Sequence, residues 1–445
     1  MKLRYKLLIG LPLLTVVSVG GLLWGIQHTG RKALEAAMAG VVADGGPMDY
    51  LGFAQPDLPD TDNAAVAWLR AVEMLEVIDA AAPEAVWPED PDGEDDGWGD
   101  WRAGEMYQPE VDAIDEPSEA DPAVLRSAID KRQPVIDALW AAADLEAVCW
   151  PLPYDDPGAL VGDLTFYGEV MKGSRVLVAD AWHAWRMGDT ARADRSLAAG
   201  LAAADDVMEL PLVLGVLVAG AMDSMVMGAM AEIEIRGPVA FPRTRAVLVE
   251  RDYRRWLATA YLHEPVGVVA QDYESELWAD YLWADDNPVP AGLRRIAGRL
   301  WRQHDLAFNV ETLCEMGRLG ARPYPEALAE LNAIETRSIP AVFPISRIDP
   351  MVKPHLVVSR VDTQRALAVW ASEPDRKPPQ DPLMGGALRQ WKAPDGGRVL
   401  WSRAAAEPAG GDYFVDRAAG VWRIGTRELP PELLPFADEL NDVEE

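Results

Sequence analysis

The chain has 445 residues, of which 49% are hydrophobic and 25% charged, the composition of a folded globular protein. Its 72 acidic and 41 basic side chains leave a formal charge of −31, which repels a phosphate backbone and makes nucleic acid a poor partner. Gly-x-Ser-x-Gly and Walker-type loops are absent from the sequence, which removes the commonest hydrolase and nucleotide-binding classes.

The N-terminus carries an uncharged run, residues 7–26, after Lys2, Arg4 and Lys6. About 20 such residues match a hydrocarbon core of about 30 Å, so the run predicts one transmembrane helix. A cleaved signal peptide is the alternative, but the apolar run continues past the weak cleavage pattern at Val17 to Gly20. More basic residues precede the span than follow it. We therefore expect residues 1–32 to anchor the chain with its N-terminus in the cytoplasm and its body outside.

The sequence contains two cysteines, Cys149 and Cys314. Outside the cytoplasm a single disulfide could join them, whereas two buried free thiols are the alternative. Two cysteines do not make a disulfide framework, and the sequence favours free thiols.

Residues 33–340 predict an α-helical domain, because apolar residues recur there at helical spacing. Pro134 is typical of the first turn of a helix. The predicted helices include 32–42, 63–75, 122–130, 134–148, 243–262, 274–283, 293–306 and 324–334.

Residues 88–121 break this pattern with fourteen Asp or Glu residues, a single Arg102 and repeated Pro and Gly, and we expect an exposed acidic loop. Within it, the spacing of Asp92, Glu94, Asp96 and Asp100 fits positions 1, 3, 5 and 9 of an EF-hand-type loop, a candidate calcium site. Ala103 stands where that loop carries a bidentate Glu. Solvated charge is therefore the favoured interpretation.

The most regular stretch predicts an αα-hairpin. Apolar residues repeat at helical spacing over residues 176–185 and 193–202, and Gly188 and Asp189 supply the turn and the cap between them. One such pair is typical of a single tetratricopeptide-like unit, although no second copy follows. The next segment, residues 210–231, holds one charge, Asp223, in 22 residues. It is a fully buried core helix or a second span, and its glycines and the acid favour the core helix.

Residues 341–427 predict a helix at 361–370 and then a small antiparallel β-module, and residues 428–445 form an acidic tail. The turn Pro394 to Gly397 lies between apolar runs of period 2, a hairpin pattern. The expected strands are 388–391, 398–402, 413–415 and 421–424. The fold class is therefore mainly α, a helical bundle with a transmembrane helix and a small β-appendage.

Two of these features resemble a family of uncharacterised bacterial membrane-anchored helical proteins. The first is the hairpin over residues 176–207. The second is a C-terminal pattern that is similar to the β-region of type II secretion pseudopilins. It consists of Asp381, Pro382, Leu383, Gly385, Ala387 and Leu388 with Gly397 to Ser402. The resemblance implies an inner-membrane anchor and a periplasmic body, and no reaction. Thr15 stands where pseudopilins carry the processing-site Glu, and Ala404–Gly411 replaces their acidic calcium loop. Neither processing nor a calcium ligand at that loop is expected.

Other candidate chemistry is weaker. Residues 272–286 interleave acids with Tyr and Trp, and Glu276 and Asp280 share a helix face, as a sugar-binding or glycan-hydrolysing site requires. Two acids on any solvated helix do the same. The five histidines lack metal-ligand spacing; His183, between two tryptophans, predicts helix packing. The methionines of residues 222–230 predict core filling rather than soft-metal binding.

The sequence therefore predicts a membrane-anchored scaffold or binding protein of the bacterial cell envelope, held in the inner membrane by residues 7–26 and contacting an envelope protein partner. No cofactor and no catalytic residue are expected. The alternative is an envelope glycan hydrolase or sugar-binding protein that uses residues 272–286.

Overall fold

A computed structural model describes residues 2–47, 58–80, 109–152, 165–210, 212–237, 239–274, 291–335, 353–373, 376–406 and 420–436. Of the described residues 73% are helical, and this part of the chain also carries one three-stranded antiparallel sheet. The α-helices are α1 Lys2–Ala43, α2 Ala64–Ala80, α4 Pro109–Asp115, α5 Pro122–Ala143, α7 Thr165–Arg186, α8 Thr190–Met208, α9 Val213–Arg236, α10 Pro242–Glu250, α11 Tyr253–Glu274, α13 Ala291–Gly320, α14 Tyr324–Glu335 and α15 Lys353–Ser372.

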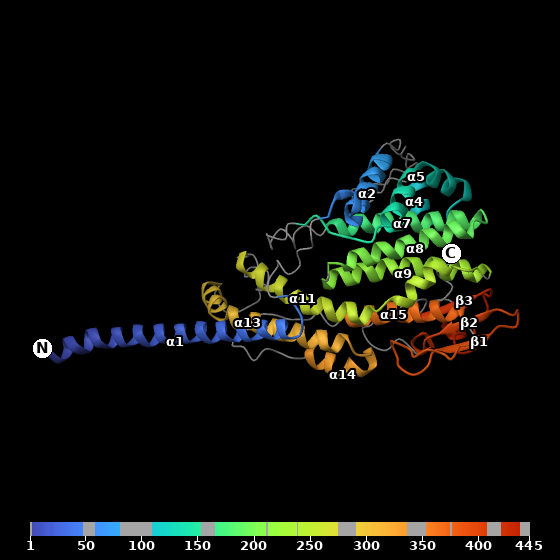
Figure 1. Ribbon diagram of the computed structural model, residues 1–445. Helices are drawn as coiled ribbons and strands as arrows, with labels where there is room; N and C mark the ends of the chain where they lie inside the picture. The colour runs from blue at the N-terminus through green and yellow to red at the C-terminus, as the bar shows by residue number, and fades with distance from the viewer. Residues whose placement is uncertain are drawn as a thin grey trace, which may run out of the picture.

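The helices stack in layers (Figure 1). α2, α4 and α5 cover α7, which pairs with α8; α8 packs on α9, and α9 on α11 and α15. One apolar core joins residues from Ala64 in α2 to Trp422 in the sheet. The division predicted at residue 340 stays a prediction, and the described residues on both of its sides contribute to that core.

The helix pair α7 and α8 forms the predicted hairpin. Gly188 has a φ of +80°, which favours glycine, and the Asp189 side chain accepts a hydrogen bond from the Arg192 backbone N–H at 3.0 Å. Small residues allow the close approach of α8 and α9, since a Cβ on Gly200 would lie 3.0 Å from a Val226 methyl carbon. The turn and the cap were both correctly predicted.

α9 is the central helix of the bundle. Among the helices whose side chains the structure describes, it is the one long and apolar enough to cross a membrane, and 56% of its most apolar window is buried inside the protein. Met222, Met227 and Met230 are fully buried in the core. Burial against four neighbouring helices supports the interpretation as a core helix.

Three predicted boundaries were wrong. Pro134 lies inside α5 rather than at a helix start, and the helix continues because Val135, Ile136 and Leu139 bury their side chains in the core. The acidic segment 88–121 includes α4, whose Ala113 and Ile114 are buried, while residues 81–108 lie outside the described residues. The helix predicted over 243–262 is divided into α10 and α11 at Arg251, whose backbone is extended.

The sheet contains the predicted hairpin. Its strands are β1 Arg389–Lys392, β2 Arg398–Trp401 and β3 Val421–Ile424, in the order β1-β2-β3. Leu400 pairs with Trp422 and both enter the main core, whereas Val399 and Trp401 point into a smaller core with Leu429 and Leu433. Trp422 Nε1 donates to Glu234 Oε2 at 2.8 Å, which fastens the sheet to the end of α9. The strand predicted at 413–415 lies outside the described residues.

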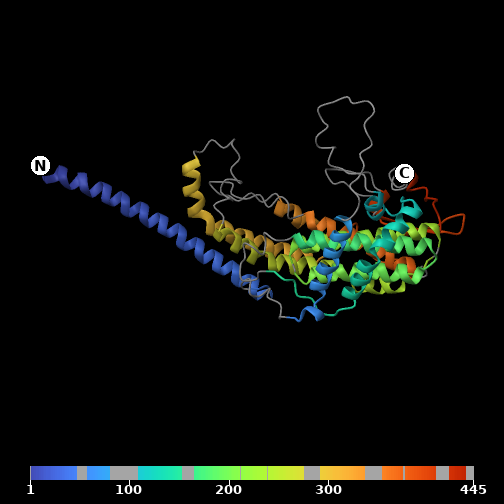
Figure 2. The same ribbon diagram turned by 90° about the horizontal axis from the view of Figure 1, so that it is seen from above.

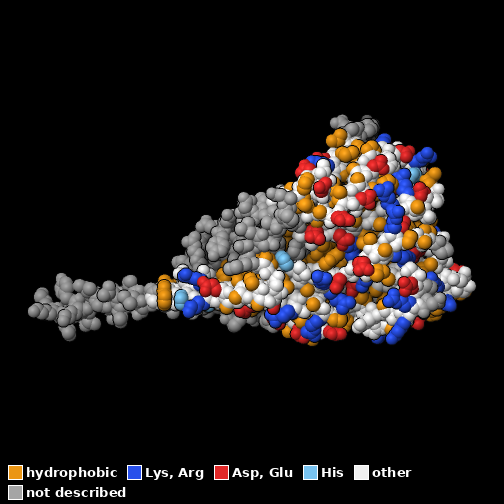
Figure 3. Space-filling view, viewed as in Figure 1, with side chains coloured by type: hydrophobic (Ala, Val, Ile, Leu, Met, Phe, Trp, Pro, Cys, Tyr) orange, Lys and Arg blue, Asp and Glu red, His pale blue; other side chains and the backbone are white. Residues whose placement is uncertain are grey.

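α1 extends away from the bundle. Its C-terminal part lies along α13, and its N-terminal part runs beyond every other element in both views (Figures 1 and 2). Side chains of residues 21–43 are described, apart from Leu22, and those before residue 21 are not. Acidic and basic side chains are interspersed over the face of the body seen in Figure 3.

Candidate functional site

The residues that the sequence predicted as ligands for a metal ion or a sugar lie outside the part of the chain whose side chains are described. This holds for Asp92, Glu94, Asp96 and Asp100, and for residues 275–286 of the acidic-aromatic segment; residues 271–274 end α11, and their side chains are not described. Among the residues that are described, no group of three or more His, Cys, Asp or Glu side chains could hold a metal ion. These predictions therefore stay predictions.

No disulfide joins Cys149 to Cys314. Cys314 is buried between α1 and α13, beside Ala37 and Val41. Burial raises the pKa of its thiol, and the nearby Asp44 raises it further. A thiol kept protonated in an apolar seam is a packing group rather than a nucleophile.

The most strongly perturbed ionisable cluster surrounds Asp223, in the middle of α9. Arg251 Nε lies 3.0 Å from Asp223 Oδ2, and the Tyr253 hydroxyl donates to the same oxygen at 2.5 Å. Arg251 also donates to the Leu201 carbonyl at 2.5 Å and pairs with Asp205, so the cluster joins α8 and α9 to the α10–α11 junction. The extended backbone at Arg251, which ends α10, is what directs this side chain into the core.

Burial controls the electrostatics of this cluster. Asp223 is 0% exposed and burial raises its pKa, while the hydrogen bond from Tyr253 lowers it. Burial also lowers the pKa of Arg251 to about 10 and raises that of Tyr253 well above its usual range. Direct contact between guanidinium and carboxylate favours the charged form of both, so it opposes the effect of burial.

A perturbed cluster of this kind is often catalytic, but here no substrate can reach it. The Asp223 carboxylate is fully enclosed, and Arg251 is 5% exposed, with its guanidinium 5.0 Å from the Trp256 ring. The arrangement fixes the relative positions of α8, α9 and α11. The sequence signal for it was the single acid in an otherwise apolar 22-residue run, since such an acid requires a buried partner.

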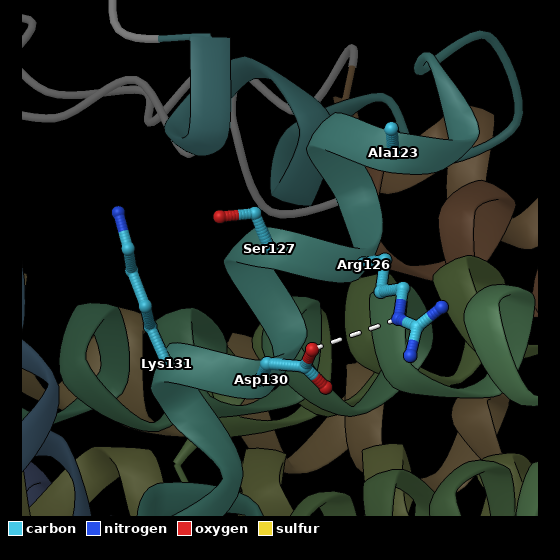
Figure 4. Close-up of a pocket in the computed structure, with 5 residues that line it drawn as sticks. All are labelled: Ala123, Arg126, Ser127, Asp130 and Lys131. Atoms are coloured by element: carbon cyan, nitrogen blue, oxygen red, sulfur yellow. Dashed lines mark ion pairs between the residues drawn. The ribbon is translucent and has the colours of Figure 1, made fainter.

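A surface hollow on α5 is lined by Ala123, Arg126, Ser127, Asp130 and Lys131 (Figure 4). Its charged and hydroxyl groups already have partners. Arg126 lies 3.7 Å from Asp130, and Glu110 accepts hydrogen bonds from Ser127 at 2.9 Å and from Lys131 at 2.6 Å. Glu110 therefore acts as a hydrogen-bond acceptor that ties α4 to α5, and its pKa is lowered mainly by the Lys131 hydrogen bond. The lining shows no activated nucleophile.

The seam between α1 and α13 connects the extended helix to the body. Thr29 Oγ1 lies 3.2 Å from His304 Nε2, which is also 3.2 Å from the Ile26 carbonyl oxygen. Gly30 is buried, and a Cβ there would meet His304 Cδ2 at 3.0 Å, so the two helices touch closely at this glycine. The sequence did not single out Thr29, Gly30 or His304, because contacts across 275 residues leave no local pattern.

Comparison with protein-family models, with curated proteins and with solved structures found no match.

Proposed function

We propose that the protein is a single-pass membrane-anchored scaffold or binding protein of the bacterial cell envelope, with residues 7–26 in the inner membrane and the helical body in the periplasm. The observation that carries this proposal is the form of α1. It is one helix from Lys2 to Ala43, and its uncharged segment lies in the part that extends beyond the body. Such a helix is long enough to span a bilayer and still contact α13.

The α1–α13 seam supports this role. Ala37 and Val41 of α1 pack with Ala307 and Val310 of α13, and Arg318 lies 3.8 Å from Asp44. An anchor held by packing and hydrogen bonds along its length would fix the orientation of the body relative to the membrane, whereas a flexible linker would not.

The α7–α8 hairpin and the C-terminal sheet supply the body of the proposed scaffold. The tetratricopeptide-like character of the hairpin and the pseudopilin-like character of the C-terminus remain part of the proposal. Asp381 Oδ2 accepts hydrogen bonds from Ser402 Oγ at 2.6 Å and from the Arg403 backbone N–H at 3.2 Å. The two halves of the C-terminal motif therefore lie in contact.

Membrane extraction tests the anchor. We expect the full chain to stay in the membrane pellet after alkaline carbonate washing, and an alkaline phosphatase fused to its C-terminus to be active. The double variant Leu13→Arg/Leu14→Arg should move the protein to the soluble fraction, because each arginine at the centre of a span costs about 2.5–3.5 kcal/mol. The control Ala36→Arg/Gly40→Arg, at exposed positions of α1, should stay in the pellet. Release of the wild-type chain by carbonate would contradict the proposal.

A further inference from the structure

Two arginines and two tryptophans meet where α7 and α9 end. Arg236 Cζ lies 4.9 Å from the centre of the Trp182 ring and 5.8 Å from that of Trp185, and Arg186 Cζ lies 5.7 Å from Trp182. The two indoles are edge-to-face at 5.5 Å. Trp182 is buried, Trp185 and Arg186 are half-buried, and Arg236 is exposed. These four residues are called the arginine–tryptophan cluster.

Neither guanidinium in the cluster has a carboxylate partner within the described residues. Arg186 donates to the carbonyl oxygens of Ser118 at 2.7 Å and Ala120 at 3.0 Å, and Arg236 donates to that of Glu232 at 3.1 Å. By contrast, Arg192, Arg245 and Arg251 each pair with an acid. The cluster therefore keeps two positive charges in a chain of net charge −31.

The two charges also lie close enough to affect each other. Burial lowers the pKa of Arg186 most, the positive charge of Arg236 lowers it further, and Asp121 raises it. A helix C-terminus stabilises one cation by its dipole. That effect does not explain why two helices bring their cations to the same indole ring, an arrangement that costs free energy through repulsion until an anion is bound.

The surroundings of the cluster have the composition of a protein-binding surface. Met187, next to Arg186 at the tip of the hairpin, is 63% exposed, and Trp185 is half-buried beside it. Trp, Met and Arg are the residue types enriched at the centres of protein interfaces. The tip lies at the end of the body opposite to the extended part of α1, so it is free of the proposed anchor (Figure 1).

We propose that the arginine–tryptophan cluster is the docking point for a carboxylate-rich segment of a partner protein. Guanidinium groups bind carboxylates through two parallel hydrogen bonds, and the half-buried Trp185 and the exposed Met187 contact apolar parts of the same segment. A polypeptide is favoured over a small anion because the apolar surface adjoins the charges. This inference rests on the proposed binding role and names the chemistry of the partner.

Fluorescence anisotropy on the detergent-solubilised full chain tests the docking site. The probe is a fluorescein-labelled peptide of about eight alternating glutamate and alanine residues. We expect saturable binding that weakens as sodium chloride increases, and a loss of about tenfold or more in affinity for Arg236→Gln. Arg236→Lys keeps the charge but lacks the planar guanidinium, so its affinity for the peptide should lie between those of the wild type and Arg236→Gln. Because the assay contains no membrane, its failure would be distinct from failure of the anchor.

The control is Arg126→Gln, which removes an arginine that is 63% exposed on α5 and already paired with Asp130. It should bind the peptide as the wild type does. Equal melting temperatures for Arg236→Gln and wild type would show that the fold is unchanged. If Arg236→Gln destabilises the chain, the peptide affinity of Arg236→Lys is compared with that of the wild type instead. Unchanged affinity in both Arg236 variants would overturn the proposal, and so would equal displacement of the peptide by inorganic phosphate at the same concentration.

Discussion

At the scale of single residues, buried charges define the core of this protein. Asp223, Asp180 and Glu234 are each at most 2% exposed, and each contacts an arginine. Asp180 also accepts a hydrogen bond from Ser196 at 2.5 Å, so α7 and α8 are joined by polar contacts as well as by apolar packing. Such groups add specificity to the packing, because each helix position must satisfy a fixed partner.

The variant Asp223→Asn should destabilise the fold by about 3–5 kcal/mol, because it removes the enclosed carboxylate that faces Arg251 and leaves this buried charge with the half-exposed Asp205 alone. The matched control is Asp205→Asn, since Asp205 pairs with the same arginine but its side chain is 48% exposed. We expect a much smaller decrease in the free energy of unfolding for the control. Urea unfolding followed by circular dichroism measures both, and equal losses would show that the buried pair has no special role.

His355, in the first turn of α15, should make stability depend on pH. Its ring stacks on Tyr261 at 5.2 Å, its Nε2 has no hydrogen-bond partner among the described residues, and burial lowers its pKa to about 4. Between pH of about 6.5 and 4, the unfolded chain binds a proton there that the folded chain does not. Stability should therefore fall as the pH is lowered through this range.

The variant His355→Gln removes that titration. Its stability should fall less steeply with decreasing pH than that of the wild type, by about 1.4 kcal/mol per pH unit at most. Parallel urea titrations between pH 4 and pH 7 test this. Identical slopes for the two proteins would mean that His355 takes up its proton in the folded state.

At the scale of elements, close helix contacts depend on glycine at particular positions. Gly30 in α1 touches α13, whereas Gly40 in the same helix is exposed and has nothing near the position of a Cβ. The same substitution should therefore stabilise α1 at Gly40 but not at Gly30.

Gly40→Ala should stabilise α1 by about 0.5–1 kcal/mol, because alanine is a better helix former. Gly30→Ala should lose that gain, because its Cβ would lie 3.0 Å from His304 Cδ2 and 3.1 Å from Gln303 Cβ. We expect faster proteolysis within the α1–α13 seam for Gly30→Ala alone. If both variants resist the protease equally, the seam is looser than the geometry indicates.

At the scale of the whole molecule, the helical body has a core that is distinct from the contacts of α1. The main core begins at Ala64 and contains no buried residue of α1, although the partly buried Met38 packs against it. Ala37 and Val41 of α1 belong instead to a small satellite core with α13. The body therefore has its own source of stability.

Deleting residues 2–20 should leave the body folded. These residues precede the described contacts of α1 with α13, which include His304 with Ile26 and Thr29. We expect the melting temperature, followed by circular dichroism, to change by no more than about 1–2 °C, because about 1 kcal/mol shifts a domain of 150–250 residues by about 2–4 °C and a larger one by less. A cooperative transition lost on deletion would show that the extended part of α1 is needed for folding.

The sequence alone was enough to predict the mainly helical class, the α7–α8 hairpin with its Gly188 turn and the three described strands, and it favoured a core helix over a second span for residues 210–231. Each depends on a local pattern: helical or two-residue spacing, a glycine at positive φ, a capping aspartate. The continuity of α5 through Pro134, the break at Arg251 and the α1–α13 seam were decided by the tertiary structure. So was the arginine–tryptophan cluster, whose arginines are 50 residues apart in the chain. In each case the partners are distant in sequence, and packing and burial outweigh local preference, so no short stretch of residues records the outcome.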